Sequence, residues 1–149
     1  MKFTDMGLSH DTLKSIQALG FETPTPIQEQ AIPILLEGKQ DFVGLASTGT
    51  GKTAAFGLPL LEQVDPDAAH PQGVILAPTR ELCLQIADDL KKFSKHRSHL
   101  KITAVYGGSN ISTQIKELRH GAQIIVATPG RLLDLIERKA AKLEKVSMV

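Results

Sequence analysis

Four short apolar runs, each followed by a glycine- or proline-bearing turn and then by a helical pattern, constrain the fold of this chain most. They are Phe42–Ala46, Val74–Ala77, Ile102–Val105 and Ile124–Ala127. Strands that alternate with helices form a parallel sheet with crossover helices, and runs without polar alternation fit strands buried on both faces. The predicted fold is therefore α/β, a parallel sheet with helices on both faces. A fifth strand is expected to begin in Lys145–Val149, so we expect the sheet to be incomplete at its C-terminal end.

Two helices are expected before the first strand. Ser9 is placed as the N-cap of one, which Gly20 ends, and Thr25 opens the other, which Gly38 ends. Loops are expected at Asp65–Gln72 and Ser94–Leu100. The predicted division of the chain is a helical region, 1–38, followed by a sheet region, 39–149.

The first apolar run leads into the glycine-rich sequence ASTGTGKT. Gly49 and Gly51 allow successive backbone N–H groups to point at one anion, while Lys52 would reach the β- and γ-phosphates and Thr53 would bind Mg²⁺. A flexible turn is the simpler interpretation, but the strand–loop–helix context favours a phosphate loop. Ala46 replaces the usual first glycine at a position that ends the strand and makes no close approach. The predicted nucleotide-phosphate residues are Ala46, Ser47, Thr48, Gly49, Thr50, Gly51, Lys52 and Thr53.

Three further loops are expected at the same edge of the sheet, because parallel strands all deliver their following loops to one edge. They read PTREL (Pro78–Leu82), YGGSN (Tyr106–Asn110) and TPGR (Thr128–Arg131). Helix initiation would explain the threonines and a proline. It does not explain Arg80 and Arg131, whose positive charge in a first helical turn costs roughly 0.3–1 kcal/mol. A bound anion would reverse the sign of that cost.

The second anionic ligand is expected to be a chain of phosphates that spans several loops. The formal net charge is only +1, so its contacts must come from locally placed groups. These loops hold one aromatic residue, Tyr106, which favours contacts to a sugar-phosphate backbone over base stacking and hence weak sequence preference. The predicted nucleic-acid-binding residues are Pro78, Thr79, Arg80, Gly107, Gly108, Thr128, Pro129, Gly130 and Arg131.

In this order, GFETPTPIQ (Gly20–Gln28), ASTGTGKT, PTREL, GG and TPGR resemble the first RecA-like domain of DEAD-box RNA helicases. The resemblance extends from Phe3 to the terminal strand and implies a RecA-like P-loop fold. It further implies binding of ATP with Mg²⁺, ATP hydrolysis stimulated by RNA, and local strand separation in partnership with a second RecA-like domain. Alanine at the first position of the phosphate loop is itself the family's form.

Phe3, Thr25 and Gln28 are predicted to join the loop residues in binding the cofactor, and Lys52 and Thr53 are the predicted catalytic residues. For Gln28 and Phe3 the resemblance implies one role, and the residues themselves offer another. Gln28 matches the family's adenine reader, and its carboxamide complements the N6 and N7 edge of adenine. The spacing Thr25-x-x-Gln28 is equally that of a capping box. Phe3 matches the family's isolated aromatic residue that stacks on the base, or it packs against the Leu8–Leu19 helix.

The acidic sequence that gives the family its name is not present in this chain. Asp88 and Asp89 lie within a predicted helix and are interpreted as a solvated face. We therefore expect this chain alone to hold nucleotide weakly and not to hydrolyse it, whereas a longer parent protein would. The incomplete sheet also leaves an edge open to self-association.

Two alternative functions stay open on the sequence. One is a non-catalytic nucleotide- or RNA-binding module, and the other is a DNA-directed helicase or translocase. A single cysteine, Cys83, cannot form an internal disulfide, and no run reaches the ~18 apolar residues of a membrane span. The predicted location is the cytoplasm, with no membrane partner.

Overall fold

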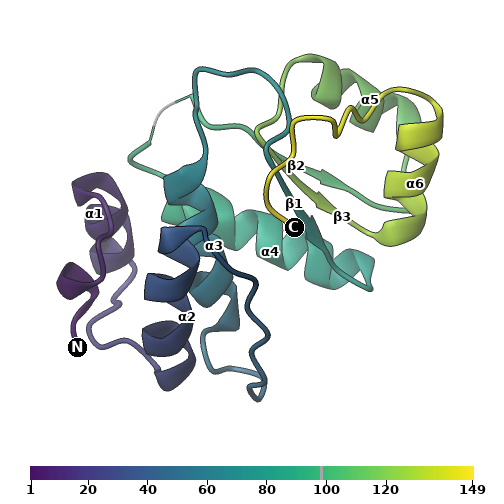
Figure 1. Cartoon of the computed structure of the whole chain (residues 1–149). Helices are drawn as coiled ribbons and strands as arrows, with labels where there is room; N and C mark the ends of the chain where they lie inside the picture. The colour runs from purple at the N-terminus through teal and green to yellow at the C-terminus, as the bar shows by residue number, and fades with distance from the viewer. Residues whose placement is uncertain (98) are drawn as a thin grey trace. The chain divides into compact units, whose positions relative to one another are not determined.

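The computed structural model describes residues 1–97 and 99–149 (Figure 1). Contacts within the chain divide it into two compact units. The first unit comprises Met1–Gln63 and Lys92–Arg97, and the second comprises Val64–Lys91 and the described residues after position 98. The predicted division at position 38 stays a prediction. Within the described residues, no helix has both the length and the apolar character needed to cross a bilayer.

The first unit is helical. It contains the short 3₁₀ helix η1 and three α-helices, with the bounds Phe3–Asp5 (η1), His10–Ala18 (α1), Pro26–Glu37 (α2) and Lys52–Gln63 (α3). Helices α2 and α3 pack against each other, and Ile32, Leu58 and Leu61 are fully buried. Buried aliphatic side chains at helical spacing thus hold the phosphate-loop helix in place.

The predicted helix ends of the first unit are confirmed. Ser9 Oγ accepts a hydrogen bond from Thr12 N at 3.3 Å, as an N-cap does. Gly20 and Gly38 follow α1 and α2 with φ angles of +86° and +64°, the left-handed conformation that glycine adopts without a steric cost. Local sequence signals therefore set where these helices begin and end.

The second unit contains a parallel sheet and the helices that cross over it. Its elements are Gly73–Leu76 (β1), Arg80–Phe93 (α4, whose last two residues belong to the first unit), Ile102–Val105 (β2), Ile111–Arg119 (α5), Ile124–Ala127 (β3) and Pro129–Glu137 (α6). The strand order is β1-β3-β2, and Ile124 is opposite both Gly73 and Ile102. The predicted parallel α/β sheet is confirmed.

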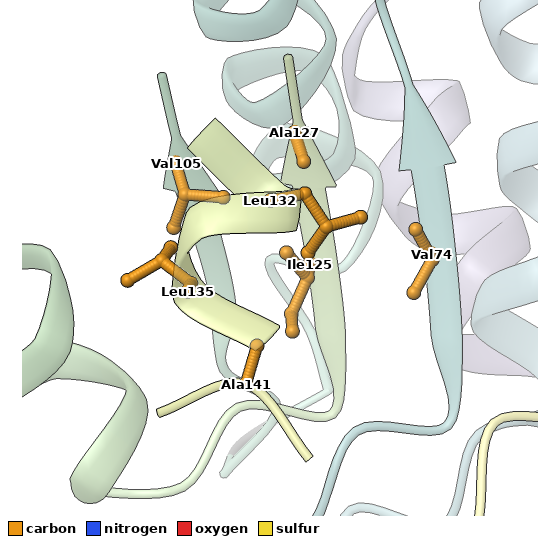
Figure 2. Close-up of a cluster of buried hydrophobic side chains, with 7 residues drawn as sticks. All are labelled: Val74, Val105, Ile125, Ala127, Leu132, Leu135 and Ala141. Carbon is orange, nitrogen blue, oxygen red and sulfur yellow. The ribbon is translucent and has the colours of Figure 1, made fainter. Parts of the chain in front are cut away.

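The crossovers place helices on both faces of this sheet. Helix α4 connects β1 to β2, two positions across the sheet, and α5 connects β2 back to β3, one position in the opposite direction. Because such crossovers are right-handed, the change of direction places α4 and α5 on opposite faces of the sheet. Figure 2 shows one face, where Leu132 and Leu135 of α6 pack on side chains of all three strands. The cluster consists of Val74, Val105, Ile125, Ala127, Leu132, Leu135 and Ala141. All four residues of β3 are fully buried, as expected for a central strand.

Three of the four predicted strands are present with their predicted bounds or within one residue of them, but the strand predicted at Phe42–Ala46 is wrong. That segment is irregular, and its Val43 and Leu45 side chains are 88% and 94% exposed. A strand must pair its backbone N–H and C=O groups with a neighbour. The described strands pair with one another and not with this segment.

The expected fifth strand begins as a single bridge. Met148 pairs in parallel with Gly73, and Val74 N donates to Met148 O at 3.0 Å. Both predicted loops lack helix and strand at their described positions, while Ser98, in the second of them, lies outside the described residues.

Candidate functional site

The phosphate loop of the first unit has the backbone that its glycines predict. Gly49 and Gly51 have φ angles of +76° and +79°, and α3 begins directly afterwards at Lys52. The helix therefore presents its N-terminal N–H groups and the positive end of its dipole to the loop. Thr53, the second residue of α3, is half-buried.

Internal hydrogen bonds close this loop on itself. Lys52 Nζ donates to Ala46 O at 2.8 Å, and Thr50 Oγ1 donates to Ser47 O at 2.6 Å. The ammonium thus already lies over the loop, bonded to a carbonyl oxygen. A phosphate oxygen is a charged acceptor that could replace that carbonyl, since hydrogen bonds between two ionised groups are stronger.

Thr25 and Gln28 hold the other side of the loop. Thr25 N donates to Gln28 Oε1 at 2.9 Å, and the reciprocal bond completes the capping box of α2. The same two side chains reach the phosphate loop: Thr25 Oγ1 donates to Thr50 O at 2.8 Å, and Gln28 Nε2 donates to Gly51 O at 3.1 Å. The capping interpretation of Gln28 is therefore confirmed, and its reading of adenine stays a prediction.

Position 51 requires a glycine both because Gln28 and Thr25 approach it closely and because its φ angle is positive. A Cβ atom at Gly51 would lie 2.2 Å from Gln28 Nε2 and 3.4 Å from Thr25 Oγ1. At Gly49, which has a similar φ angle, a Cβ atom would meet nothing within 4 Å. The close approach of α2 to the loop thus distinguishes two glycines that look equivalent in the sequence.

Phe3 is buried rather than presented to a ligand. It is 5% exposed, and its ring centroid lies 5.9 Å from that of Phe21, which in turn lies 5.8 Å from Phe93. Phe3 also lines a cavity of about 360 Å³ with Leu13 and Ile16 of α1. These contacts favour the packing interpretation of Phe3, and stacking on a base stays a prediction.

In the second unit, the loops after β1 and β2 meet through Arg80. Thr79 Oγ1 accepts from Leu82 N at 3.2 Å and caps α4, as predicted. The Arg80 guanidinium lies 5.0 Å from the centre of the Tyr106 ring, a cation–π distance. Gly108 has a φ angle of +79°, and a Cβ atom there would lie 3.8 Å from Arg80 Nη1.

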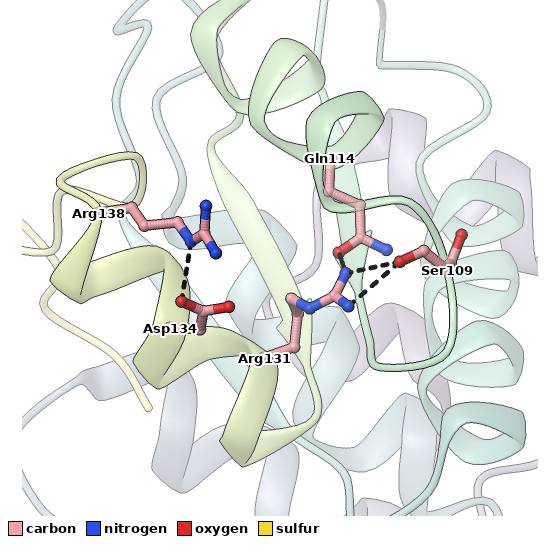
Figure 3. Close-up of polar contacts among 5 residues, drawn as sticks. All are labelled: Ser109, Gln114, Arg131, Asp134 and Arg138. Atoms are coloured by element: carbon pink, nitrogen blue, oxygen red, sulfur yellow. Dashed lines mark hydrogen bonds and ion pairs between the residues drawn. The ribbon is translucent and has the colours of Figure 1, made fainter.

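The loop after β3 joins the same group through Arg131 (Figure 3). Arg131 Nη1 donates to Gln114 Oε1 at 2.9 Å, and both terminal nitrogens donate to Ser109 O at 3.2 Å. Gln114 is 4% exposed and also bonds the backbone N and O of Tyr106, at 3.3 and 3.2 Å. One buried amide therefore fixes both the loop after β2 and the arginine of α6.

Gln114 and Ser109 are not among the residues predicted from the sequence. A signal for Gln114 was present, because Ile111, Gln114, Ile115 and Leu118 follow the spacing of a buried helix face, on which a glutamine must find polar partners. Thr128 stands at the N-cap position of α6 with Pro129 at its first position, as predicted, although its side chain makes no capping hydrogen bond.

The predicted nucleic-acid-binding residues are accessible. Thr128 and Arg131 are half-buried, and the others are exposed: Pro78, Thr79, Arg80, Gly107, Gly108, Pro129 and Gly130. Arg80 and Arg131 both have partners within the protein. These partners give a structural reason for placing an arginine in a first helical turn, beside the bound anion that the sequence led us to expect. Within the described residues, no group of three or more histidine, cysteine or acidic side chains could hold a metal ion.

Comparison with known proteins gives consistent matches over nearly the whole chain. The family model described as DEAD/DEAH box helicase matches residues 25–149. The chain is 53% identical over 146 residues to the DEAD-box ATP-dependent RNA helicase CshA of Streptococcus pneumoniae, covering 98% of this chain and 28% of that protein. It is 51% identical over 145 residues to the ATP-dependent RNA helicase CshA of Listeria monocytogenes, covering 97% of this chain and 28% of that protein.

Solved structures give the same result. The crystal structure of a DEAD box protein from the hyperthermophile Methanococcus jannaschii matches with a TM-score of 0.92 and 44% identity, over 98% of this chain and 39% of that chain. Dbp5 of S. cerevisiae, bound to RNA and ADP BeF3, matches with a TM-score of 0.85 and 37% identity, over 97% of this chain and 36% of that chain. The chain thus spans between a quarter and two fifths of the length of these proteins.

Proposed function

Because this chain belongs to the DEAD/DEAH box helicase family, we propose that it is the ATP-binding and RNA-binding part of an ATP-dependent RNA helicase. Identity of 53% over 98% of the chain to a DEAD-box ATP-dependent RNA helicase carries this proposal. In the complete protein, ATP hydrolysis would be coupled to the separation of RNA strands, with a second RecA-like domain as partner.

The first unit is proposed to bind ATP. The loop residues from Ala46 to Thr53 would surround the phosphates, with Lys52 exchanging the carbonyl of Ala46 for a phosphate oxygen. Thr53 would supply one ligand to Mg²⁺, an ion that usually keeps several waters and takes few ligands from the protein. Gln28 is proposed to read adenine while it braces Gly51, and Phe3 would have to turn out of its aromatic cluster to stack on the base.

The second unit is proposed to bind the RNA backbone through Arg80, Arg131 and the exposed backbone of the three loops. The cations are held in place by Tyr106 and Gln114, which supports contact with phosphates at fixed positions. Bases would not be read, so affinity should depend weakly on sequence and strongly on salt.

Binding of a fluorescent ATP analogue to the 149-residue chain tests the ATP proposal. We expect Lys52→Ala to abolish measurable binding, because the loop loses the cation that faces the phosphates. Lys39→Ala removes another exposed lysine, outside the loop, and serves as the matched control. Equal affinity of the two variants would contradict the proposal.

A non-catalytic binding module is the second candidate, since the described residues offer no acidic cluster for a metal ion. ATPase turnover with and without RNA tests it in this chain, and turnover well above background would overturn the proposal that the chain alone is inactive. Matched RNA and DNA single strands test the DNA-directed alternative, because contacts to the 2′-hydroxyl distinguish them.

Self-association of the chain and a cytoplasmic location are also proposed. Val43 and Leu45 are exposed, and the outer edge of β1 pairs, among the described residues, through the bridge between Gly73 and Met148. Both features support pairing with a second copy. A strictly monomeric species in light scattering at high concentration would contradict self-association.

A further inference from the structure

A second group of cations lies in the second unit, away from the arginines discussed above. A cavity of about 490 Å³ is found at the C-terminal ends of α5 and α6, and its rim carries Arg119, Arg138, Lys139 and Lys142. All four are exposed. Helices that cross over a parallel sheet run opposite to its strands, so this cavity is at the edge where the strands begin, opposite the predicted RNA-binding loops.

The floor of the cavity is aliphatic. Ile115, Leu118 and Ala140 line it, and all three are partly buried and pack against the core cluster of Figure 2. Neither an acidic nor an aromatic side chain is among the described residues that line the cavity. The site therefore combines a cationic rim with an aliphatic floor.

One wall of the cavity is supported by hydrogen bonds from buried amides. Ala69 forms part of the lining, and the neighbouring Ala68 O accepts from both Gln72 Nε2 and Gln123 Nε2, each at 3.2 Å. Gly121 lies directly behind, since a Cβ atom there would be 3.1 Å from Ala69 Cβ. These contacts define the shape of the cavity before any ligand enters.

Helix dipoles explain the presence of only some of the cationic residues on the rim. Arg119 ends α5, and Arg138 caps α6 and donates to Asp134 Oδ1 at 2.9 Å (Figure 3), so both are favoured at helix C-termini. Lys139 has a φ angle of +59°, the left-handed conformation for which glycine is the usual choice after a helix. Lys142 lies beyond the helix. A lysine kept in a strained conformation beside other cations points to a ligand.

We propose that this cavity docks an acidic peptide segment of a partner protein, with carboxylates on the rim and an aliphatic side chain on the floor. A phosphate chain fits less well, for three reasons. The cavity is at helix C-termini, which lack the free backbone N–H groups that commonly hold phosphates. No aromatic residue is there to stack on a base. The aliphatic floor would have no counterpart in a sugar-phosphate backbone.

Fluorescence anisotropy of a labelled peptide with the 149-residue chain tests this proposal. The probe is a fluorescein-labelled peptide that contains Glu-Asp-Leu-Glu-Asp-Leu-Glu, and a second peptide carries serine in place of both leucines. We expect saturable binding of the first peptide, and affinity roughly tenfold lower for the serine peptide, because it loses its contact with the floor.

Matched double variants locate the site. Arg119→Glu with Lys142→Glu should weaken binding by at least roughly tenfold, because two attractive contacts become repulsive. Lys116→Glu with Lys145→Glu changes the net charge equally at exposed positions outside the cavity and should cost less than about threefold. Equal losses in both pairs would show a general charge effect and overturn the proposal.

Lys139→Gly separates binding from folding. It removes a rim cation and relieves the left-handed strain, so the urea midpoint should stay or rise while peptide affinity falls by about threefold. An unchanged affinity would overturn the proposal. The proposal would also be overturned if the Arg119→Glu, Lys142→Glu variant lost its affinity for a ten-residue oligouridylate but kept its affinity for the peptide. The inference is independent of the proposed helicase function, whose failure would leave these outcomes unchanged.

Discussion

The two units present their candidate ligand groups in opposite ways. In the first unit, the phosphate loop is closed by its own hydrogen bond from Lys52 Nζ to Ala46 O and by a hydrogen bond from Gln28 of α2 to Gly51 O. In the second unit, Arg80 and Arg131 are positioned by Tyr106, Ser109 and Gln114 from neighbouring loops, and Arg80 remains exposed. A ligand of the first unit must exchange internal hydrogen bonds, whereas a ligand of the second meets cations that are already in place.

The same contrast holds for the strands beneath these loops. The loops of the second unit follow strands that pair with one another and are largely buried, although Leu76 at the end of β1 is 50% exposed. The phosphate loop follows Phe42–Ala46, which is not part of the sheet. The position of the phosphate loop within the first unit therefore depends on α3 and on the contacts from α2. Disturbing those contacts should affect the first unit more than the equivalent change affects the second.

The largest effect is expected from Gly51→Ala. A methyl group there collides with Gln28 Nε2 and forces an unfavourable φ angle, so the free energy of unfolding should fall by about 2–3 kcal/mol in urea titrations. Gly49→Ala carries only the cost of the φ angle, about 1–2 kcal/mol. Equal losses in the two variants would mean that Gln28 does not support the loop.

Gln114→Met should have the next largest effect. The change keeps the side-chain volume but leaves the backbone N–H and C=O of Tyr106 and one N–H of Arg131 without their partner, at about 2 kcal/mol. RNA affinity should fall as well, because Arg131 is no longer held. Thr113→Val, at the exposed neighbouring position, is the control and should change neither quantity.

Gln28→Glu tests the double role proposed for this residue. The acceptor for Thr25 N remains, but the donor to Gly51 O is lost, so stability should fall by about 1 kcal/mol. The preference for ATP over GTP should be lost too, since a carboxylate cannot donate to N7 of adenine. Gln30→Glu adds the same charge at an exposed position of α2. A preference that survives in Gln28→Glu would disprove adenine reading.

The smallest effect is expected from Cys83 of α4, because burial of its side chain raises the pKa of the thiol. Above the pKa of Cys83 in the unfolded chain, the unfolded chain loses the thiol proton while the folded chain keeps it. The free energy of unfolding is therefore highest below that pKa and falls as the pH rises above it. Between about pH 8 and pH 9.5 the loss should be less than about 1 kcal/mol in urea titrations. Cys83→Val removes the ionisable group, and an identical pH dependence in that variant would contradict this assignment.

The sequence by itself determined the features that depend on neighbours along the chain. The caps at Ser9 and Thr79 and the left-handed turns at Gly20 and Gly38 all follow from local patterns. The resemblance also identified the family that the comparisons show. These features are predictable because each one is decided within a few residues.

Only the tertiary structure decided which segments pair and which polar groups meet. Phe42–Ala46 has the composition of a strand, but a strand exists only with a partner that supplies its backbone hydrogen bonds. The contact of Gln28 with Gly51 and that of Gln114 with Arg131 join residues far apart in the sequence. Composition and spacing specify the groups that need partners, whereas the packing of the elements selects the partners they receive.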